Sequence, residues 1–133
     1  MREAVIVSAV RTPVGKMGGG LTPFEPHELG GMVVKEAVRR AGVEGDEIDD
    51  VMLGNVTNKQ YSNAARAIAL EAGLPVEVPA ITIDRQCGSA LNALANAAIM
   101  IQAGVHDVVV AGGVEMDSKR PWVMARVEKA YQM

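Results

Sequence analysis

The chain has 133 residues, of which 49% are hydrophobic and 22% are charged, a composition typical of one globular domain with a buried core. Its net charge of −3 and its 3% aromatic content offer neither a basic surface nor stacking side chains, so we expect no nucleic-acid partner. No apolar run reaches the roughly 18 to 20 residues of a membrane span, and the single cysteine forms no internal disulfide. We therefore expect a cytoplasmic protein without a membrane partner.

The first half of the chain predicts two strands with a helix between them. Residues 5–10 are almost entirely apolar and β-branched, which is typical of a strand covered on both faces in a parallel sheet. A helix is predicted to begin near Pro26, which suits a first helical position, and to stop at Gly42. Residues 51–53 repeat the pattern of a buried strand.

The second half continues this alternation. A second helix is predicted with Ser62 or Asn63 as its N-cap and with Gly73 at its end. Residues 80–83 and 108–111 read as two further buried strands, separated by a third helix. The resulting order βαβαβαβ indicates a layered α/β fold with a mostly parallel sheet.

The third helix, predicted over residues 88–103, is apolar on nearly all sides. Its interior carries only three polar residues, Asn92, Asn96 and Gln102, among many alanines. A helix apolar all round is buried all round, whereas one sheet covers only one side. We therefore expect a further layer, supplied by a missing part of the polypeptide or by a partner subunit. The alternative is an alanine-rich helix with one face lightly exposed.

The only cysteine, Cys87, lies where the third predicted strand gives way to this helix. Free cysteine usually behaves as a small buried apolar residue, so core packing is the simplest interpretation. At a helix N-terminus, however, N–H groups stabilise a thiolate and lower its pKa from about 8.5 toward roughly 3.5 to 7.5. Gly88 leaves room for an approaching carbonyl, and the N–H of Cys87 itself could hold an oxyanion. The residues alone favour a nucleophile and inert packing about equally.

A cysteine nucleophile normally needs a base, and neither histidine is well placed to act as one. His27 is predicted in the first turn of the first helix. His106 precedes the last strand, at the end of the sheet opposite to Cys87. Both are expected at the surface, so we expect the base to lie outside this sequence.

Several segments resemble thiolases, the acetyl-CoA acetyltransferases and 3-ketoacyl-CoA thiolases. The most specific are DRQCGSALNALANAAIMIQAG and DVVVAGGVEMDSKRPW, which resemble the acyl-enzyme region of that family. The segments VIVSAVRTPVGKMGGGL, ELGGMVVKEAVRRAGV, VMLGNV and SNAARAIALEAGLP show the same likeness in the family's order. The resemblance covers essentially the whole chain. It implies a thiolase-like fold of five α/β/α/β/α layers built from two similar halves, of which this chain is only the N-terminal one.

The resemblance also implies how the chain is divided and what it does. Residues 1–118 correspond to the core of the N-terminal half, and residues 119–133 to the start of an inserted loop domain or a connector. Cys87 is the catalytic residue that a 3-ketoacyl-CoA or acetyl-CoA acylates, and the acyl group passes to CoA or to a second acetyl-CoA, as in fatty acid metabolism. A histidine and a second cysteine from the C-terminal half assist, so this piece alone is expected to be inactive.

The expected partners are acyl-CoA, CoA and the missing C-terminal half or a partner subunit. The resemblance implies a homo-oligomer, a dimer or tetramer, in which the strand at residues 80–83 pairs with its copy. CoA thioesters are substrates; we expect no metal and no permanently bound cofactor, and no cofactor-binding residue is assigned. Two alternatives stay open: a condensing enzyme of the β-ketoacyl synthase type, and a non-catalytic dimerisation module in which Cys87 is inert.

One departure from the family pattern concerns the charge near the sulfur. Asp84 stands where the family often has asparagine. A carboxylate three residues before Cys87 opposes thiolate formation unless it is paired, and Arg85 or Arg66 is the expected partner.

Overall fold

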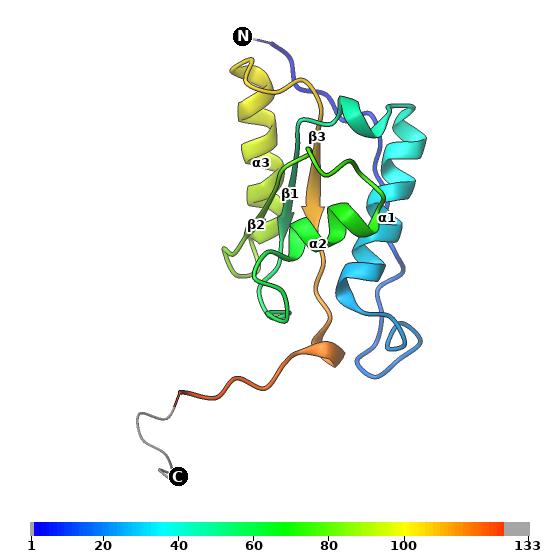
Figure 1. Ribbon diagram of the computed structural model, residues 1–133, viewed down its shortest axis with the longest axis vertical. Coiled ribbons are helices and arrows are strands. Elements are labelled where there is room, and N and C mark those ends of the chain that lie inside the picture. The colour runs from blue at the N-terminus through cyan, green and yellow to red at the C-terminus, as the bar shows by residue number, and fades with distance from the viewer. Residues whose placement is uncertain (1, 127–133) are drawn as a thin grey trace.

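The computed structural model describes residues 2–126, which form three helices and one parallel sheet of three strands (Figure 1). The helices are α1 (Pro26–Ala41), α2 (Ala64–Glu71) and α3 (Ser89–Gln102); the strands are β1 (Asp50–Gly54), β2 (Ala80–Ile83) and β3 (Val109–Gly113). Short 3-10 turns follow α1 and β3, at Gly45–Glu47 and Asp117–Lys119. The expected α/β class with a parallel sheet is confirmed. Within these residues, no helix is both long and apolar enough to span a bilayer.

The helices begin and end where their capping residues predict. Pro26 is the first residue of α1, and Gly42 closes that helix in a left-handed conformation with φ of 70°. Asn63 caps α2, because its side-chain oxygen accepts a hydrogen bond from the N–H of Arg66 at 3.1 Å. These local signals fix helix ends without help from the rest of the fold.

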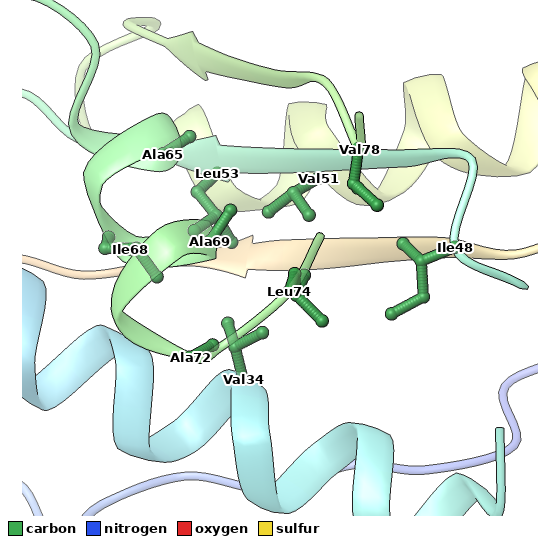
Figure 2. Close-up of a cluster of buried hydrophobic side chains, with 10 residues drawn as sticks. All are labelled: Val34, Ile48, Val51, Leu53, Ala65, Ile68, Ala69, Ala72, Leu74 and Val78. Carbon is green, nitrogen blue, oxygen red and sulfur yellow. The ribbon is translucent and has the colours of Figure 1, made fainter. Parts of the chain in front are cut away.

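The sheet separates two helical layers of unequal thickness. α1 and α2 cover one face, whereas α3 alone covers the other (Figure 1). Alternate side chains of β1 point to opposite faces, so Val51 and Leu53 join the core beneath α2 while Met52 joins the smaller one beneath α3. Figure 2 shows the larger core, which consists of Val34, Ile48, Val51, Leu53, Ala65, Ile68, Ala69, Ala72, Leu74 and Val78.

The strand expected at residues 5–10 is not part of the sheet. This segment is extended but forms no ladder, and Val5, Ile6 and Val7 are 65%, 79% and 67% exposed. A largely apolar cavity of about 680 Å³ has residues of this segment, of α1 and of β3 in its lining. A strand exists only beside a neighbouring strand, and within residues 2–126 none pairs with this segment.

Helix α3 is not buried on all sides within this chain. Ser89, Ala93 and Ala97 are its buried residues, whereas Leu91 is 72% exposed and Ile99 is 59% exposed. The side of α3 turned away from the sheet is therefore open and apolar. The expectation that a further layer covers this side of α3 stays a prediction.

The chain leaves the layered body after the turn at Asp117–Lys119. Residues 121–126 contain no helix or strand, and Figure 1 shows them running away from the sheet. Trp122 is 99% exposed. Of the connector expected over residues 119–133, residues 127–133 lie outside the described part of the chain.

Candidate active site

The carboxyl ends of the three strands lie side by side. In the register of the sheet, Gly54 of β1 pairs with Ile83 of β2 and with Gly113 of β3. β1 is central, and the chain crosses from β1 to β2 through α2 on one face and from β2 to β3 through α3 on the other. Parallel sheets bind ligands beyond the strand ends at such a switch point, because the following loops diverge there.

A cavity of about 500 Å³ opens at this point, and Cys87 is part of its wall. Cys87 is exposed, so the interpretation that it packs in the core is wrong. The loops after all three strands contribute to the lining, which consists of Gly54, Val56, Thr57, Gln86, Cys87, Ser89, Ala90, Gly113, Val114, Glu115 and Arg120.

A tight hydrogen-bonded turn holds Cys87 between β2 and α3. The buried hydroxyl of Ser89 accepts a hydrogen bond from the N–H of Arg85 at 2.8 Å and donates one to the carbonyl of Gln86 at 2.6 Å. Asp84 Oδ1 accepts a hydrogen bond from the N–H of Gln86 at 3.2 Å. Two side chains, one from before and one from after the cysteine, thus hold the backbone of Arg85 and Gln86 that leads into it. Ser89 was not predicted as a site residue, although a serine two residues after a cysteine at a helix start is a usable signal.

Gln86, directly before Cys87, adopts a strained backbone conformation. Its φ is 51°, the only positive value among the described non-glycine residues. A glutamine in the left-handed region costs free energy on the order of 1 kcal/mol, and such strain persists only where the surroundings enforce it. The hydrogen bonds to the N–H and the carbonyl of Gln86 provide that enforcement.

The first turn of α3 packs directly on the ends of two strands. A Cβ atom at Gly54 would lie 2.6 Å from the backbone nitrogen of Ala90, and one at Gly113 would lie 3.0 Å from the Ala90 Cβ. Glycine is needed at both positions because the helix approaches so closely. Gly88 is the N-cap of α3 and no side chain caps this end, so the partial positive end of the helix lies beside the cavity that contains Cys87.

The wall formed by the loops after β1 and β3 is held together by polar contacts. The carboxylate of Glu115 accepts hydrogen bonds from the N–H of Val56 at 2.9 Å, from the N–H of Thr57 at 2.8 Å, and from the Thr57 hydroxyl. Asn58 donates to the carbonyl of Met116 at 2.9 Å and accepts from its N–H at 2.8 Å. The two loops therefore form one hydrogen-bonded unit.

Two buried asparagines complete this unit. Asn55 and Asn58 are only 2% and 1% exposed. Asn55 donates to the carbonyl of Val114 at 2.8 Å and lies 3.4 Å from the side-chain oxygen of Asn58. Neither residue was predicted as part of the site, because the burial of a polar side chain arises from the fold and is not visible in the sequence.

The partner of Asp84 differs from the one expected. Lys59 Nζ lies 3.1 Å from Asp84 Oδ2, whereas Arg85 donates to Asn92 and Arg66 donates to the backbone carbonyls that follow α2. The N–H of Gln86, and after it the Lys59 ammonium, lower the pKa of Asp84. The carboxylate is therefore paired, but by a lysine 25 positions earlier in the chain.

Neither histidine lines the cavity of Cys87. His27 lies in the first turn of α1 with its ring centroid 4.9 Å from that of Tyr61, and His106 Nε2 lies 3.8 Å from Asp50 Oδ2 at the amino end of β1. Both are half-buried rather than fully at the surface. Within the described residues, Glu115 and Arg120 are the only titratable side chains besides Cys87 that line the cavity.

Comparison with known proteins identifies the family. The thiolase N-terminal domain model matches residues 4–133. Acetyl-CoA acetyltransferase of Cupriavidus necator is 46% identical over 134 residues, which covers 100% of this chain and 34% of that protein. Beta-ketoadipyl-CoA thiolase of Acinetobacter baylyi is 43% identical over 134 residues, covering 98% of this chain and 33% of that protein.

The fold comparison agrees. The crystal structure of the Bacillus anthracis acetyl-CoA acetyltransferase superposes with a TM-score of 0.90 at 44% identity, covering 100% of this chain and 34% of that one. The chain belongs to the thiolase family and matches its N-terminal domain. It spans about a third of the length of these relatives.

Proposed function

We propose that Cys87 is the nucleophile of a thiolase-type acyltransferase, and that the whole protein moves acyl groups between this cysteine and CoA or acetyl-CoA. One observation carries the proposal: the sulfur is exposed beside the N-terminus of α3, in a cavity built from the loops after all three strands. Inert packing explains neither the exposure nor the strained turn before it. Relatives named as acetyl-CoA acetyltransferases support the choice of substrate class.

The chemistry is a thioester exchange. The Cys87 thiolate attacks the carbonyl carbon of an acyl-CoA, a new S–C bond forms, and the carbonyl electron pair moves onto oxygen. The backbone N–H of Cys87 is the donor proposed to hold that oxyanion. When the carbonyl re-forms, the S–C bond to CoA breaks and CoA leaves as a thiolate that takes up a proton. The acyl group then passes to the sulfur of a CoA thiolate, or to the α-carbon of an acetyl-CoA from which a base has removed an α-proton. In either case the S–C bond to Cys87 breaks and the cysteine leaves as a thiolate.

The surroundings of Cys87 favour negative charge but supply no obvious proton carrier. The positive end of α3 stabilises anions near the sulfur. Glu115 lines the cavity, but its carboxylate is engaged by hydrogen bonds from Val56 and Thr57. We therefore propose that the base and the second acid come from the part of the protein outside this chain, and that the chain alone does not turn over.

The test uses the full-length protein that contains this chain. On incubation with acetyl-CoA and removal of free CoA, peptide mass spectrometry should find one acetyl group on the peptide that carries Cys87. Cys87→Ser should remove both the label and the turnover, because a serine hydroxyl is a far weaker nucleophile than a thiolate. Ser118→Ala, on the outer loop after β3, serves as a matched control.

Other outcomes select the rival functions. Acetylation at a different residue, or turnover that survives Cys87→Ser, rejects the proposal. An acylated Cys87 that accepts only malonyl thioesters as the second substrate indicates a β-ketoacyl synthase type of condensing enzyme. Failure of both acylation and iodoacetamide labelling of Cys87 between pH 5 and 9 indicates a non-catalytic dimerisation module.

We also propose that the protein is a homo-oligomer, a dimer or tetramer, that pairs copies through β2. β2 is an edge strand of the described sheet, and Ile81 on it is 49% exposed. An apolar edge strand is a ready site for pairing with another chain. Light scattering of the full-length protein should give a multiple of the chain mass; a monomer contradicts this proposal.

The remaining proposals concern chain organisation and setting. Residues 1–118 are proposed as the core of the N-terminal half and residues 119–133 as a connector or the start of an inserted domain; limited proteolysis should then cut after Lys119 and spare the core.

We place the enzyme in cytoplasmic fatty acid metabolism, with CoA thioesters as substrates and no permanently bound cofactor. Recovery of the protein in a membrane fraction, or of a cofactor with the purified protein, contradicts these statements.

A further inference from the structure

Asp84 and Lys59 join the turn that carries Cys87 to the loop after β1. One oxygen of the Asp84 carboxylate accepts the backbone N–H of Gln86 at 3.2 Å, and the other lies 3.1 Å from Lys59 Nζ. Lys59 Nζ is also 3.4 Å from the carbonyl oxygen of Asn55. The two oxygens of the Asp84 carboxylate thus contact two neighbouring loops, one oxygen to each loop.

The hydrogen bond from Gln86 acts where the backbone is strained. Gln86 has a φ of 51° and directly precedes Cys87. A short acidic or amide side chain that accepts the N–H two residues ahead favours a tight turn at that position. The carboxylate of Asp84 therefore helps to fix the direction in which the chain enters Cys87.

The same carboxylate places a negative charge three residues before Cys87, on the turn that carries it. A negative group near a thiol disfavours the thiolate, which is the reactive form. An amide at position 84 offers the same acceptor oxygen without the charge, so the carboxylate needs a compensating cation. Arg85 does not serve, since its guanidinium bonds Asn92, and Lys59 is the cation that the structure places there.

We propose that Lys59 is a positioning residue for Cys87. The Lys59 ammonium holds the Asp84 carboxylate against the Gln86 N–H and offsets the negative charge of that carboxylate. The proposal deepens the function assigned above, since it rests on Cys87 as the nucleophile. Because Lys59 also contacts the carbonyl of Asn55, the loop after β1 is coupled to the reactivity of the cysteine. Glu115 and Asn58 in turn hold that loop to the segment after β3.

The test compares the rate of iodoacetamide labelling of Cys87 at pH 7 and low salt in the full-length protein. Lys59→Met leaves an uncompensated carboxylate on the turn that carries Cys87. It should slow labelling about threefold, which is the order of effect that one unit charge exerts through water over several ångströms. Asp84→Asn should speed labelling about twofold, since the acceptor for Gln86 remains and the lysine is then uncompensated. The double variant should return to within about 1.5-fold of the wild type.

A purely structural role predicts a different pattern. If Lys59 only packed, the slower labelling caused by its loss would persist in the double variant and would not depend on salt. The proposed effect of charge on the labelling rate should instead shrink by half or more at 1 M NaCl, because exposed charges are screened. The pair is 49% and 40% exposed in its side chains, so every variant is expected to fold, which circular dichroism checks. Lys35→Met, the same change on the outer face of α1, is the matched control and should leave labelling unchanged.

The outcomes separate this inference from the proposed function. Equal labelling of Lys59→Met and wild type, with Cys87 still acylated by acetyl-CoA, overturns the role of Lys59 and leaves the function intact. A threefold slower labelling with no acylation of Cys87 supports the role of Lys59 and overturns the function. In turnover assays, Lys59→Met should lower kcat and leave KM for acetyl-CoA within about twofold, since Lys59 does not line the cavity.

Discussion

The two faces of the sheet are covered in different ways. The face under α1 and α2 buries ten side chains in one cluster, and α2 is sandwiched between α1 and β1 (Figure 2). Among the described residues, the cluster under α3 buries only Met52, Ala93 and Ala97, although α3 is longer and more apolar than α2. Leu91, Leu94 and Ile99 on α3 remain 72%, 42% and 59% exposed.

This difference shows that two kinds of interaction hold the helices. α2 is held mainly by apolar burial, whereas α3 is held by close backbone approach at its first turn and by hydrogen bonds at both of its ends. The site lies on the α3 side, where Ser89, Gly54 and Gly113 set the position of Cys87. Burial fixes the scaffold, and polar contacts fix the nucleophile.

The largest expected effect compares an isoleucine on each face. Ile68→Ala in α2 removes a side chain that is 0% exposed and should destabilise the chain by about 2 to 5 kcal/mol, because it leaves a cavity in the larger core. Ile99→Ala in α3 should change stability by less than about 0.5 kcal/mol, because that side chain is mostly in solvent.

Urea unfolding of both variants and of the wild-type chain measures the contrast. Equal destabilisation by the two changes would show that α3 is as deeply packed as α2 in the isolated chain, and would remove the basis of the comparison. In the full-length protein, Ile99→Ala should cost more than in the chain alone if a further layer covers α3.

The second prediction concerns glycines at the close contacts on each face. Gly54→Ala places a Cβ 2.6 Å from the backbone nitrogen of Ala90, so either β1 or α3 must move; we expect a loss of about 1 to 3 kcal/mol and a displaced Cys87. Gly30→Ala in α1 places a Cβ 2.9 Å from the Ile68 side chain. Because Ile68 is β-branched and fully buried, it has little freedom to move, and we expect a similar loss of about 1 to 3 kcal/mol.

Iodoacetamide labelling of Cys87 distinguishes the two glycine variants. Gly54→Ala should change the labelling rate, whereas Gly30→Ala should not, because only the first acts through the start of α3. Stability alone does not make this distinction. A Gly30→Ala variant with altered labelling would indicate that the two faces are coupled through the sheet.

The sequence predicted features that depend on neighbours in the chain and missed those that depend on distant residues. The ends of α1, the Asn63 cap of α2 and the bounds of β2 follow from local patterns and are confirmed. The prediction of a strand at residues 5–10 is wrong, because an apolar pattern does not indicate whether a partner strand is present.

The site shows the same division. The position of Cys87 between a strand and a helix could be predicted, since the strand, the cysteine and the glycine follow one another in the sequence. The partner of Asp84 is 25 residues away at Lys59, and the partners of Glu115 are 58 and 59 residues away at Thr57 and Val56. Such contacts arise only from strand order and register, which no local pattern encodes.

The third and smallest effect tests the polar anchoring of the chain where it enters β3. Asp49, at the entry to β1, accepts the N–H groups of Val108 at 3.0 Å and Asp107 at 2.6 Å, where the chain leaves α3 for β3. These two hydrogen bonds, that of Val108 foremost, lower the pKa of Asp49 below its ordinary value of 3.8. A lowered carboxyl pKa adds stability above the unfolded-state pKa, and this contribution disappears as the pH falls through the folded-state value.

Asp49→Asn keeps one acceptor oxygen but removes the charge. It should destabilise the chain by about 1 kcal/mol near pH 6. The loss is moderate because charge-assisted hydrogen bonds at a half-exposed site are only moderately stronger than neutral ones. The difference from wild type should narrow below about pH 4 and vanish once Asp49 is protonated in the folded state. Urea unfolding at pH 6, 4 and 3 follows this trend. A difference in stability that stays constant with pH would mean that Asp49 holds the entry to β3 by shape alone, and that its charge plays no part.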